Sequence, residues 1–329
     1  MTTLKDVAKL AGVSPSTVSI VVNQKYDKLK ISPATQEKVR KAIRELNYQP
    51  NVAAKVLRRN QTNEYMIAVY WANDARSAVI GSILKGFQHT IESNHYPVNI
   101  VIRPYRNGTL SQKTDLQTRG AFHAAIIANT AAEDMEFLES FSPIIPTVLF
   151  NRYLKNYNTV IVDNHQFGSL AVKPFLTSTG RLGILSLKNP YLAMQTRRQA
   201  VIQAFKKANY QIENSSQLVS QEDTAEAGYE AMKMCSLDDL PDIFYCDSDT
   251  IAFGAIRYLQ EKGISVPDKV VFLAAGTQTH ETAQFLTPSL KTLEIPTQKI
   301  ASTCLDTLMQ ILQGHEKPPI HKQCPPFMT

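Results

Sequence analysis

The chain has 329 residues, of which 43% are hydrophobic and 19% charged, and its formal net charge is +6. Such a composition indicates a soluble globular protein with a large core and two or three domains. No stretch is apolar enough to span a membrane, and the N-terminus lacks the apolar central run of a signal peptide, so we expect a cytoplasmic protein. The scattered cysteines, none of them in a CxxC pair, favour reduced and mostly buried thiols: Cys235, Cys246, Cys304 and Cys324.

Residues 4–23 carry the first two predicted helices. Gly12 separates two short apolar runs, and we expect it to end the first helix in a left-handed conformation. Ser14 and Pro15 then cap and start the second helix. A third apolar run completes a three-helix core, which predicts a helix-turn-helix domain. The apolar positions are Leu4, Val7, Ala8, Ala11, Val18, Val21 and Val22, followed by Val39, Ile43 and Leu46.

Small polar residues lie on the outer side of the second predicted helix. The hydroxyls of Ser14, Ser16, Thr17 and Ser19 can reach phosphate oxygens or base edges of DNA. The other interpretation is that these serines and threonines only cap the helix, as such residues commonly do near a helix start. For this stretch taken alone, both interpretations stay open.

The positive charge is confined to the N-terminal part of the chain. Up to residue 60 there are twelve lysines and arginines against four acidic residues, a net charge of +8, which leaves −2 for the remainder. A charge run is often just a solvated surface. Its concentration beside a predicted helix-turn-helix instead favours a polyanionic partner, whose phosphates would make binding depend steeply on salt.

Two sequence runs carry a family resemblance. KDVAKLAGVSPSTVS at residues 5–19, followed by AIRELNYQPN at residues 42–51, resembles the start of the LacI/GalR family of bacterial transcription repressors, in particular its galactose- and maltose-type sugar-operon regulators. The resemblance implies a helix-turn-helix domain at 1–48, a hinge helix and linker at 49–63, and an effector-binding and dimerisation domain at 64–329. It also implies a homodimer that binds palindromic, double-stranded operator DNA.

The resemblance further implies which residues contact DNA. In the family the hinge forms a helix only on the operator, where a leucine from each subunit enters the minor groove; Ala54 and Leu57 match this element. The family recognition helix usually reads TVSR or TVSH, whereas Ile20 stands last here, and isoleucine packs on a thymine methyl but cannot hydrogen-bond guanine. The expected DNA contacts are Thr3, Ser14, Pro15, Ser16, Thr17, Ser19, Ile20, Asn23, Ala54, Lys55, Leu57 and Arg58.

From residue 64 onward, apolar strands alternate with longer helices, which predicts parallel sheets covered by helices on both faces. The resemblance implies a core like periplasmic sugar-binding proteins, with two doubly wound α/β subdomains at 64–163 plus 289–329 and at 164–288. The predicted strands are 65–70, 98–103, 124–128, 146–150, 160–162, 182–186, 217–219, 242–246 and 270–274. The predicted helices are 78–93, 133–141, 167–177, 192–208, 224–234, 250–262 and 298–312.

Ligands of doubly wound sheets bind at the carboxyl ends of the strands, so polar residues there are effector-binding candidates. Arginine forks and carboxylates suit a polyol, and the only tryptophan can stack on a sugar face. Trp71 can equally be a core residue, and for Asp249 we favour a helix cap. Relatives usually carry a carboxylate or amide where this chain has AAGT, at 274–277. Arg198, on the predicted helix 192–208, is a candidate because the resemblance implies that it matches the family arginine that holds ligand hydroxyls. The candidates are Trp71, Asn73, Asp74, Asn129, Asp163, Arg198, Ser248, Asp249 and Thr277.

These features predict a DNA-binding repressor of a carbohydrate operon, controlled by a small ligand, with no catalytic residues, metal or cofactor. An enzyme is disfavoured because the GxxxxGK[ST], GxGxxG, GxSxG and HExxH motifs are absent and the seven histidines show no metal-ligand spacing. A sugar-binding protein of a transporter would need an export signal. A regulator with a non-sugar effector, or with none, remains an alternative.

Overall fold

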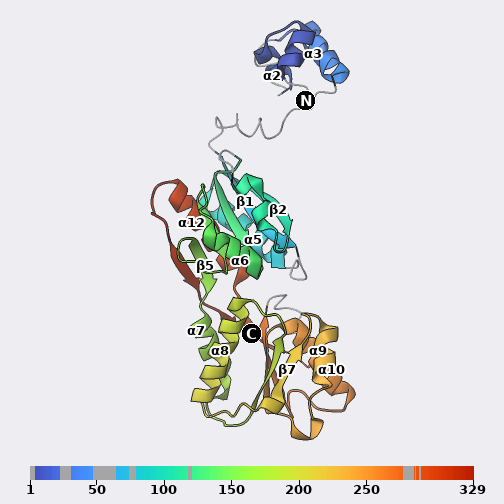
Figure 1. The fold of residues 1–329 in the computed structure, drawn as a ribbon, viewed down its shortest axis with the longest axis vertical. Coiled ribbons are helices and arrows are strands. Elements are labelled where there is room, and N and C mark those ends of the chain that lie inside the picture. Colours follow the sequence, from blue (N-terminus) through green and yellow to red (C-terminus); the bar gives the residue numbers. More distant parts are fainter. Residues whose placement is uncertain are drawn as a thin grey trace. The chain divides into compact units, whose positions relative to one another are not determined.

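The computed structural model describes residues 4–22, 31–46, 64–73, 79–117, 121–276, 285, 287–288 and 290–329 (Figure 1). The chain divides into two compact units, Met1–Glu64 and Tyr65–Thr329. The expected hinge helix therefore lies outside the described residues. So do these candidate site residues: Thr3, Asn23, Ala54, Lys55, Leu57, Arg58, Asp74 and Thr277.

The described part of the first unit consists of α1 (Leu4–Ala11), α2 (Pro15–Val22) and α3 (Pro33–Glu45). Gly12 has a φ of +64°, and its N–H donates to the Lys9 carbonyl while the N–H of Val13 donates to that of Ala8. This pair of bonds is a Schellman motif, which ends α1 and turns the chain into α2. The predicted role of Gly12 is thus confirmed.

Three helices enclose the small core of the first unit. Val7, Val18 and Val39, one from each helix, are fully buried and pack together. At the start of α3, Ser32 Oγ accepts the N–H of Thr35 at 3.3 Å. The apolar periodicity read from the sequence therefore corresponds to the packed faces of α1, α2 and α3.

The first sheet of the second unit has the strand order β11-β5-β4-β3-β1-β2, and all its strands are parallel. Its strands are β1 (Tyr65–Asn73), β2 (Val98–Arg106), β3 (Ala124–Ala128), β4 (Thr147–Phe150), β5 (Asn158–Val162) and β11 (His321–Cys324). The helices beside it are α5 (Val79–Asn94), α6 (Ala132–Ser140) and α12 (Thr297–Leu312), with the short helices η1 (Leu110–Gln112) and η2 (Thr114–Leu116). We call this sheet with these helices the first subdomain.

Alternation along β1 explains how this sheet is covered on both faces. Ile67 and Val69 belong to the cluster that contains Ile300 of α12, whereas Ala68 and Tyr70 belong to the cluster with Leu138 of α6. Successive side chains of a strand point to opposite faces, so a strand buried on both faces is apolar throughout.

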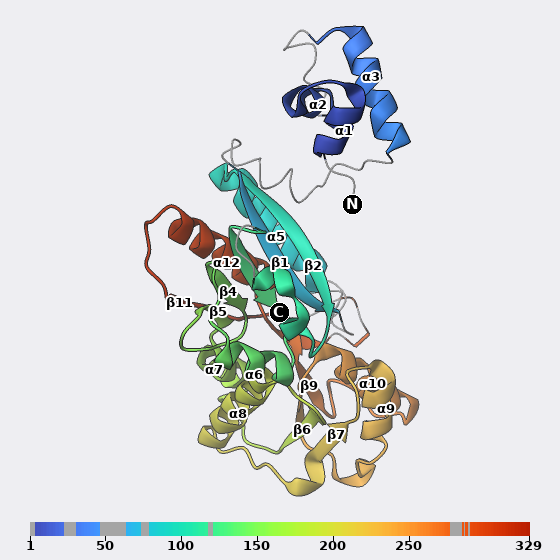
Figure 2. The same ribbon diagram turned by 45° about the horizontal axis from the view of Figure 1, so that its top comes forward.

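The second sheet has the order β12-β10-β9-β8-β6-β7, with only β12 antiparallel (Figure 2). Its strands are β6 (Leu182–Leu187), β7 (Gln217–Ser220), β8 (Ile243–Cys246), β9 (Val271–Gly276), β10 (Lys291–Glu294) and β12 (Phe327–Met328). Its helices are α7 (Asn164–Val172), α8 (Leu192–Lys207), α9 (Ala225–Met232) and α10 (Asp249–Glu261), with the short helices η3 (Lys173–Phe175), η4 (Asn214–Ser216) and η5 (Leu237–Asp239). We call this sheet with its helices the second subdomain.

Three short strands, β10, β11 and β12, were not predicted from the sequence, and two of them change the division of the core. β10 pairs with β9 and β12 pairs with β10, so both lie in the second sheet, whereas we expected residues 289–329 in the first subdomain. Only α12 and β11 return to the first. The chain therefore passes between the subdomains three times: after β5, after β10 and after β11.

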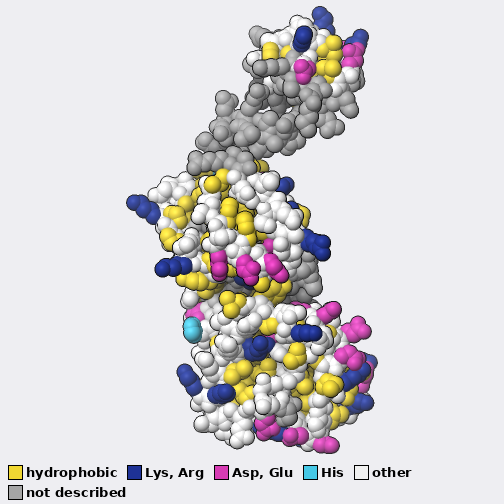
Figure 3. Space-filling view, viewed as in Figure 1, with side chains coloured by type: hydrophobic (Ala, Val, Ile, Leu, Met, Phe, Trp, Pro, Cys, Tyr) yellow, Lys and Arg dark blue, Asp and Glu magenta, His cyan; other side chains and the backbone are white. Residues whose placement is uncertain are grey.

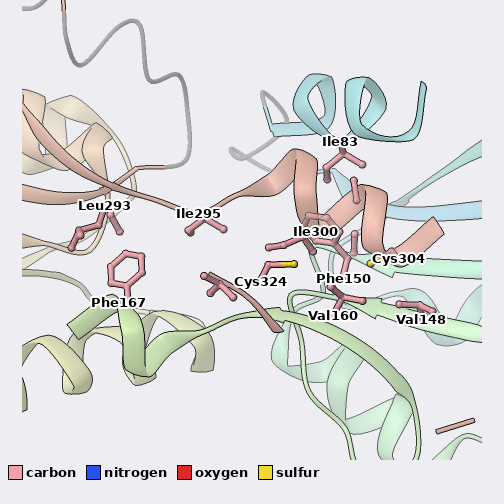
Figure 4. Packing of buried hydrophobic residues seen from close by; sticks show 14 of the residues in the cluster. Ile83, Val148, Phe150, Val160, Phe167, Leu293, Ile295, Ile300, Cys304 and Cys324 are labelled. Carbon is pink, nitrogen blue, oxygen red and sulfur yellow. The ribbon is translucent and has the colours of Figure 1, made fainter. Parts of the chain in front are cut away.

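The largest apolar cluster runs through both subdomains. It contains Phe167 and Leu293 of the second subdomain together with Val160 and Ile300 of the first, and Ile295 lies on the segment that joins them (Figure 4). The two sheets thus share one continuous core beside the crossing segments. Among the described residues, no helix combines the length and the apolar character needed to cross a bilayer.

Candidate functional site

Helix α2 presents an uncharged, hydroxyl-bearing start. Val18 and Val21 are buried, whereas Ser14, Pro15 and Ser16 are exposed. Ser14 Oγ accepts the N–H of Thr17 at 3.1 Å and lies 2.9 Å from its hydroxyl. Ser14 therefore caps α2, as predicted from the sequence. The exposed positions beside it, Ser16 included, are those that a recognition helix presents to base edges.

The described positive charge of the first unit gathers on α3. Lys38, Arg40 and Lys41 are exposed there, and Lys41 Nζ lies 3.9 Å from Glu45. The second unit differs, since acidic and basic side chains are interspersed over the face drawn in Figure 3. Neither positive nor negative charge dominates that face, which agrees with the net charge of −2 beyond residue 60.

A cavity of about 90 Å³ lies where the carboxyl ends of strands from both sheets meet. In the first sheet β1 and β3 are neighbours, and in the second β6 and β8 are; each pair marks the point where the strand order reverses, the usual ligand position in doubly wound sheets. The lining residues are Trp71, Val79, Asn129, Phe150, Asn151, Arg152, Tyr191, Ala193, Met194, Arg197, Asp223, Ser248, Ile295 and Thr297.

Three predicted candidates line this cavity. Trp71, only 6% exposed, lies two residues before the end of β1, and its indole nitrogen has no hydrogen-bond partner. Asn129 follows β3 with a φ of +61°, and its Nδ2 donates to the Ala72 carbonyl at 2.6 Å. Ser248 caps α10 by accepting the N–H of Ile251 at 3.4 Å, while its hydroxyl donates to Asp223.

Three other candidates lie outside the lining. Asp163 caps α7, with Oδ1 accepting the N–H groups of His165 and Gln166. Asp249 is the first residue of α10; we expected it to be the cap, but that position belongs to Ser248. Arg198 pairs with a buried carboxylate instead of facing the cavity. The side chain of Asn73 lies outside the described part of the molecule.

The arginine of α8 that lines the cavity is Arg197, one residue before the predicted Arg198. Met194, Arg197 and Val201 are spaced three and four residues apart, so they share the buried face of α8. Arg197 is only 4% exposed, and burial lowers the pKa of its guanidinium. Helical phase on α8 is the signal in the sequence that distinguishes the two arginines.

A buried carboxylate, Asp247, stands behind this wall of the cavity. Its Oδ2 accepts Arg198 Nη1 at 2.7 Å and the Leu187 N–H at 2.9 Å. Burial raises the pKa of the Asp247 carboxyl, and the Arg198 guanidinium opposes that rise. The Arg198–Asp247 pair thus fixes the backbone between β8 and α10, from which Ser248 enters the cavity.

One contact joins the two walls of the cavity. Arg152 follows β4 and donates to the carbonyls of Asn151 and Thr130, at 2.9 and 3.2 Å. Its guanidinium lies 5.1 Å from the ring centre of Tyr191, which precedes α8 in the other subdomain. This cation–π contact ties the subdomains together across the cavity.

Within the described ranges, no three His, Cys, Asp or Glu side chains are grouped as metal ligands. The cavity instead combines aromatic side chains, arginines, an amide and a hydroxyl. Such a lining is suited to holding and orienting a small polar molecule with a ring.

Comparisons with known proteins agree with this architecture. Residues 3–51 match the bacterial regulatory proteins of the lacI family, and residues 181–329 match the periplasmic binding protein-like domain. The HTH-type transcriptional repressors PurR of Vibrio vulnificus (strain CMCP6) and Vibrio parahaemolyticus serotype O3:K6 (strain RIMD 2210633) are 27% and 28% identical. The alignments cover 96% of this chain and 93% and 94% of those proteins.

Solved structures support the same assignment. A LacI family transcription regulator from Clostridium acetobutylicum is 28% identical, with a TM-score of 0.74 over 80% of this chain and 98% of that chain. The lac repressor dimer bound to operator and an anti-inducer shares the fold, with a TM-score of 0.68 at 20% identity over 99% of this chain and 97% of that one. These relatives are regulators and not enzymes, as we predicted for this protein. The chain is thus similar over almost its whole length to repressors of the LacI family, and its residues 3–51 match that family's own model.

Proposed function

We propose that this protein is a transcriptional repressor that binds a palindromic operator as a homodimer and responds to a small molecule bound in the cavity. The observation that carries the proposal is the pairing of two parts in one chain. A helix-turn-helix with a net charge of +8 up to residue 60 precedes a core whose cavity is built by both subdomains. The match of residues 3–51 to the lacI family and the similarity to PurR repressors support the same function.

The mechanism we propose is linkage between the two sites. A ligand contacting Trp71 in one subdomain and Arg197 in the other favours one relative arrangement of the subdomains over others. In a dimer, that arrangement sets the spacing of the paired DNA-binding units, so the ligand changes operator affinity and the operator changes ligand affinity by the same factor.

The direct test is selection of bound duplexes from a random pool, followed by titration of the selected duplex. We expect a palindromic site. Affinity should fall by about a thousandfold or more between roughly 50 and 200 mM salt, because each neutralised phosphate releases counterions. Failure to bind any duplex at low ionic strength would contradict the proposed function.

Ile20 gives a sharper prediction at base level. Replacing Ile20 with arginine should shift the selected operator toward guanine at the contacted position, because arginine donates two bonds to a guanine edge where isoleucine offers only an apolar contact. The change of preference should be about tenfold or more, as one bidentate contact discriminates by ~1–3 kcal/mol. Lys38→Gln on α3 is the matched control, expected to weaken binding to all sequences alike. An unaltered sequence preference in Ile20→Arg would show that Ile20 does not read bases.

Dimerisation is part of the proposal, because one small helix-turn-helix makes few contacts and two match a palindrome. We expect sedimentation equilibrium to give twice the chain mass of 36.8 kDa.

A carbohydrate operon, suggested by the family resemblance, is our starting candidate for the regulated genes. Inspection of the operons that flank selected sites tests this. A ligand that raises the melting temperature distinguishes a sensing regulator from one that has lost its effector.

A further inference from the structure

Arg197 is a buried cation with an unused donor. Its side chain is 4% exposed, its Nε donates to the Ala193 carbonyl at 3.2 Å, and its Nη1 has no hydrogen-bond partner. The guanidinium lies 5.5 Å from the ring centre of Phe167, a contact that supplies no anion. A buried guanidinium N–H without an acceptor is costly, so this arrangement points to an acceptor atom supplied by a ligand.

Arg197 shares a carboxylate with a second arginine. Asp247 faces both Arg197 and Arg198; its Oδ2 bonds Arg198 Nη1 at 2.7 Å, and its Oδ1 has no hydrogen-bond partner. Asp223, on the cavity wall, accepts the hydroxyl of Ser248. Two arginines thus share one carboxylate, which leaves a positive charge on this group of three described side chains.

The other wall contributes a second unused donor. Trp71 Nε1 is buried and has no hydrogen-bond partner, and Trp71 belongs to the first subdomain while Arg197 belongs to the second. Two unpaired N–H donors in one cavity require acceptor atoms from the ligand, because a buried donor without a hydrogen bond carries a desolvation cost. The aromatic rings of Phe150 and Tyr191 line the space between polar groups.

We propose that the effector is a small organic anion whose carboxylate or phosphate oxygen bonds the guanidinium of Arg197. This rests on the proposed function, since it specifies the effector of the same cavity. The anion supplies the missing negative charge and an acceptor for Trp71 Nε1. A sugar acid or a sugar phosphate meets this requirement, whereas a neutral polyol leaves the charge of Arg197 uncompensated.

The test pairs neutral probes with their anionic counterparts on the full-length protein. Melting temperature and calorimetric affinity are measured with D-glucose, D-glucuronate and D-glucose 6-phosphate, with D-galactose and D-galacturonate, and with acetate and inorganic phosphate. We expect anionic members to bind and stabilise, and their neutral counterparts to bind at least about tenfold more weakly. Comparison of the uronates with glucose 6-phosphate shows whether the cavity prefers a carboxylate or a phosphate.

Variants then locate the interaction. Arg197→Gln should lower the affinity for the anion by about ten- to hundredfold, the loss expected for a charged hydrogen bond. Arg257→Gln removes an arginine that is 71% exposed on α10 and should leave affinity unchanged. Binding of the selected operator by both variants, measured without ligand, reports whether each has folded.

Two results overturn the assignment: neutral probes that bind as tightly as their anionic counterparts, or a set in which no anion binds. Either result leaves the proposed function intact if the same samples bind the selected operator. Loss of operator binding by the wild-type protein would instead refute the proposed function itself. Because the paired probes differ in charge, the wild-type measurement decides the matter even if Arg197→Gln does not fold.

Discussion

Replacing Asp134 with alanine is expected to destabilise the protein by about 3–5 kcal/mol, because three backbone donors would lose their only carboxylate. Asp134 is 1% exposed and lies in the first turn of α6. Its oxygens accept the N–H groups of Gly108 at 3.1 Å, Leu110 at 3.0 Å and Ala131 at 3.1 Å, and the Tyr105 hydroxyl at 3.3 Å. One side chain therefore ties the loop after β2 to the start of α6.

Urea unfolding followed by circular dichroism measures this loss. Glu136→Ala is the control, because Glu136 is exposed on the same helix and the substitution should change stability by less than about 0.5 kcal/mol. Asp134→Asn keeps the side-chain volume but replaces one accepting oxygen with an NH₂ group. Its loss of stability should therefore lie between those of Glu136→Ala and Asp134→Ala. Equal stability of Asp134→Ala and Glu136→Ala would show that water replaces the carboxylate without cost.

Replacing Gly254 with alanine is expected to destabilise the second subdomain by about 3 kcal/mol or more. A Cβ at this position would lie 1.7 Å from the Ala225 carbonyl oxygen and 2.6 Å from the Tyr229 nitrogen. Both are backbone atoms of α9, so neither can rotate away from the added Cβ. A Cβ added to Gly228 of α9 would likewise lie 2.1 Å from the Ile251 carbonyl oxygen, which means that α9 and α10 touch backbone to backbone.

Thermal unfolding should show a decrease of at least about 6 °C for Gly254→Ala, at ~2–4 °C per kcal/mol for a domain of this size. Gly81→Ala is the matched control: no atom lies within 4 Å of a Cβ there, and alanine favours the helix, so α5 should be unchanged or slightly stabilised. Ligand binding should also weaken in Gly254→Ala, because α10 starts beside Ser248 of the cavity. A melting temperature equal to that of Gly81→Ala would show that the helices can separate freely.

The longer elements of the fold could be predicted because the pattern of apolar residues along them shows which positions are buried. The run from Ile67 to Ala72 is apolar at every position, as a strand covered on both faces must be, and helix α5 repeats its apolar residues at helical spacing. β10 gave no such signal, because three of the four residues in KTLE are polar. Its Glu294 is nonetheless buried, with Oε1 accepting the Thr292 hydroxyl at 2.6 Å. Tertiary pairing, not composition, makes this segment a strand.

The candidate site was only partly predictable for the same kind of reason. Positions after strands placed Trp71, Asn129 and Ser248 at the cavity, since parallel strands end at one edge. Sequence order does not say which way a side chain turns once a helix has begun. Asp163 therefore became a cap, and Arg198 turned to Asp247. Arg152 was missed because it lies in a loop whose partner, Tyr191, is distant in sequence.

The late return of α12 and β11 to the first sheet bears on how the protein is made. A ribosome releases β1 to β5 early, yet the helix that packs on β3, β4 and β5, and the strand that borders β5, are among the last segments synthesised. The nascent first subdomain thus carries an uncovered apolar face during most of translation, a state prone to association with other chains. We infer that a fragment stopped after Val162 would aggregate, and that productive folding depends on shielding of that face until synthesis is complete.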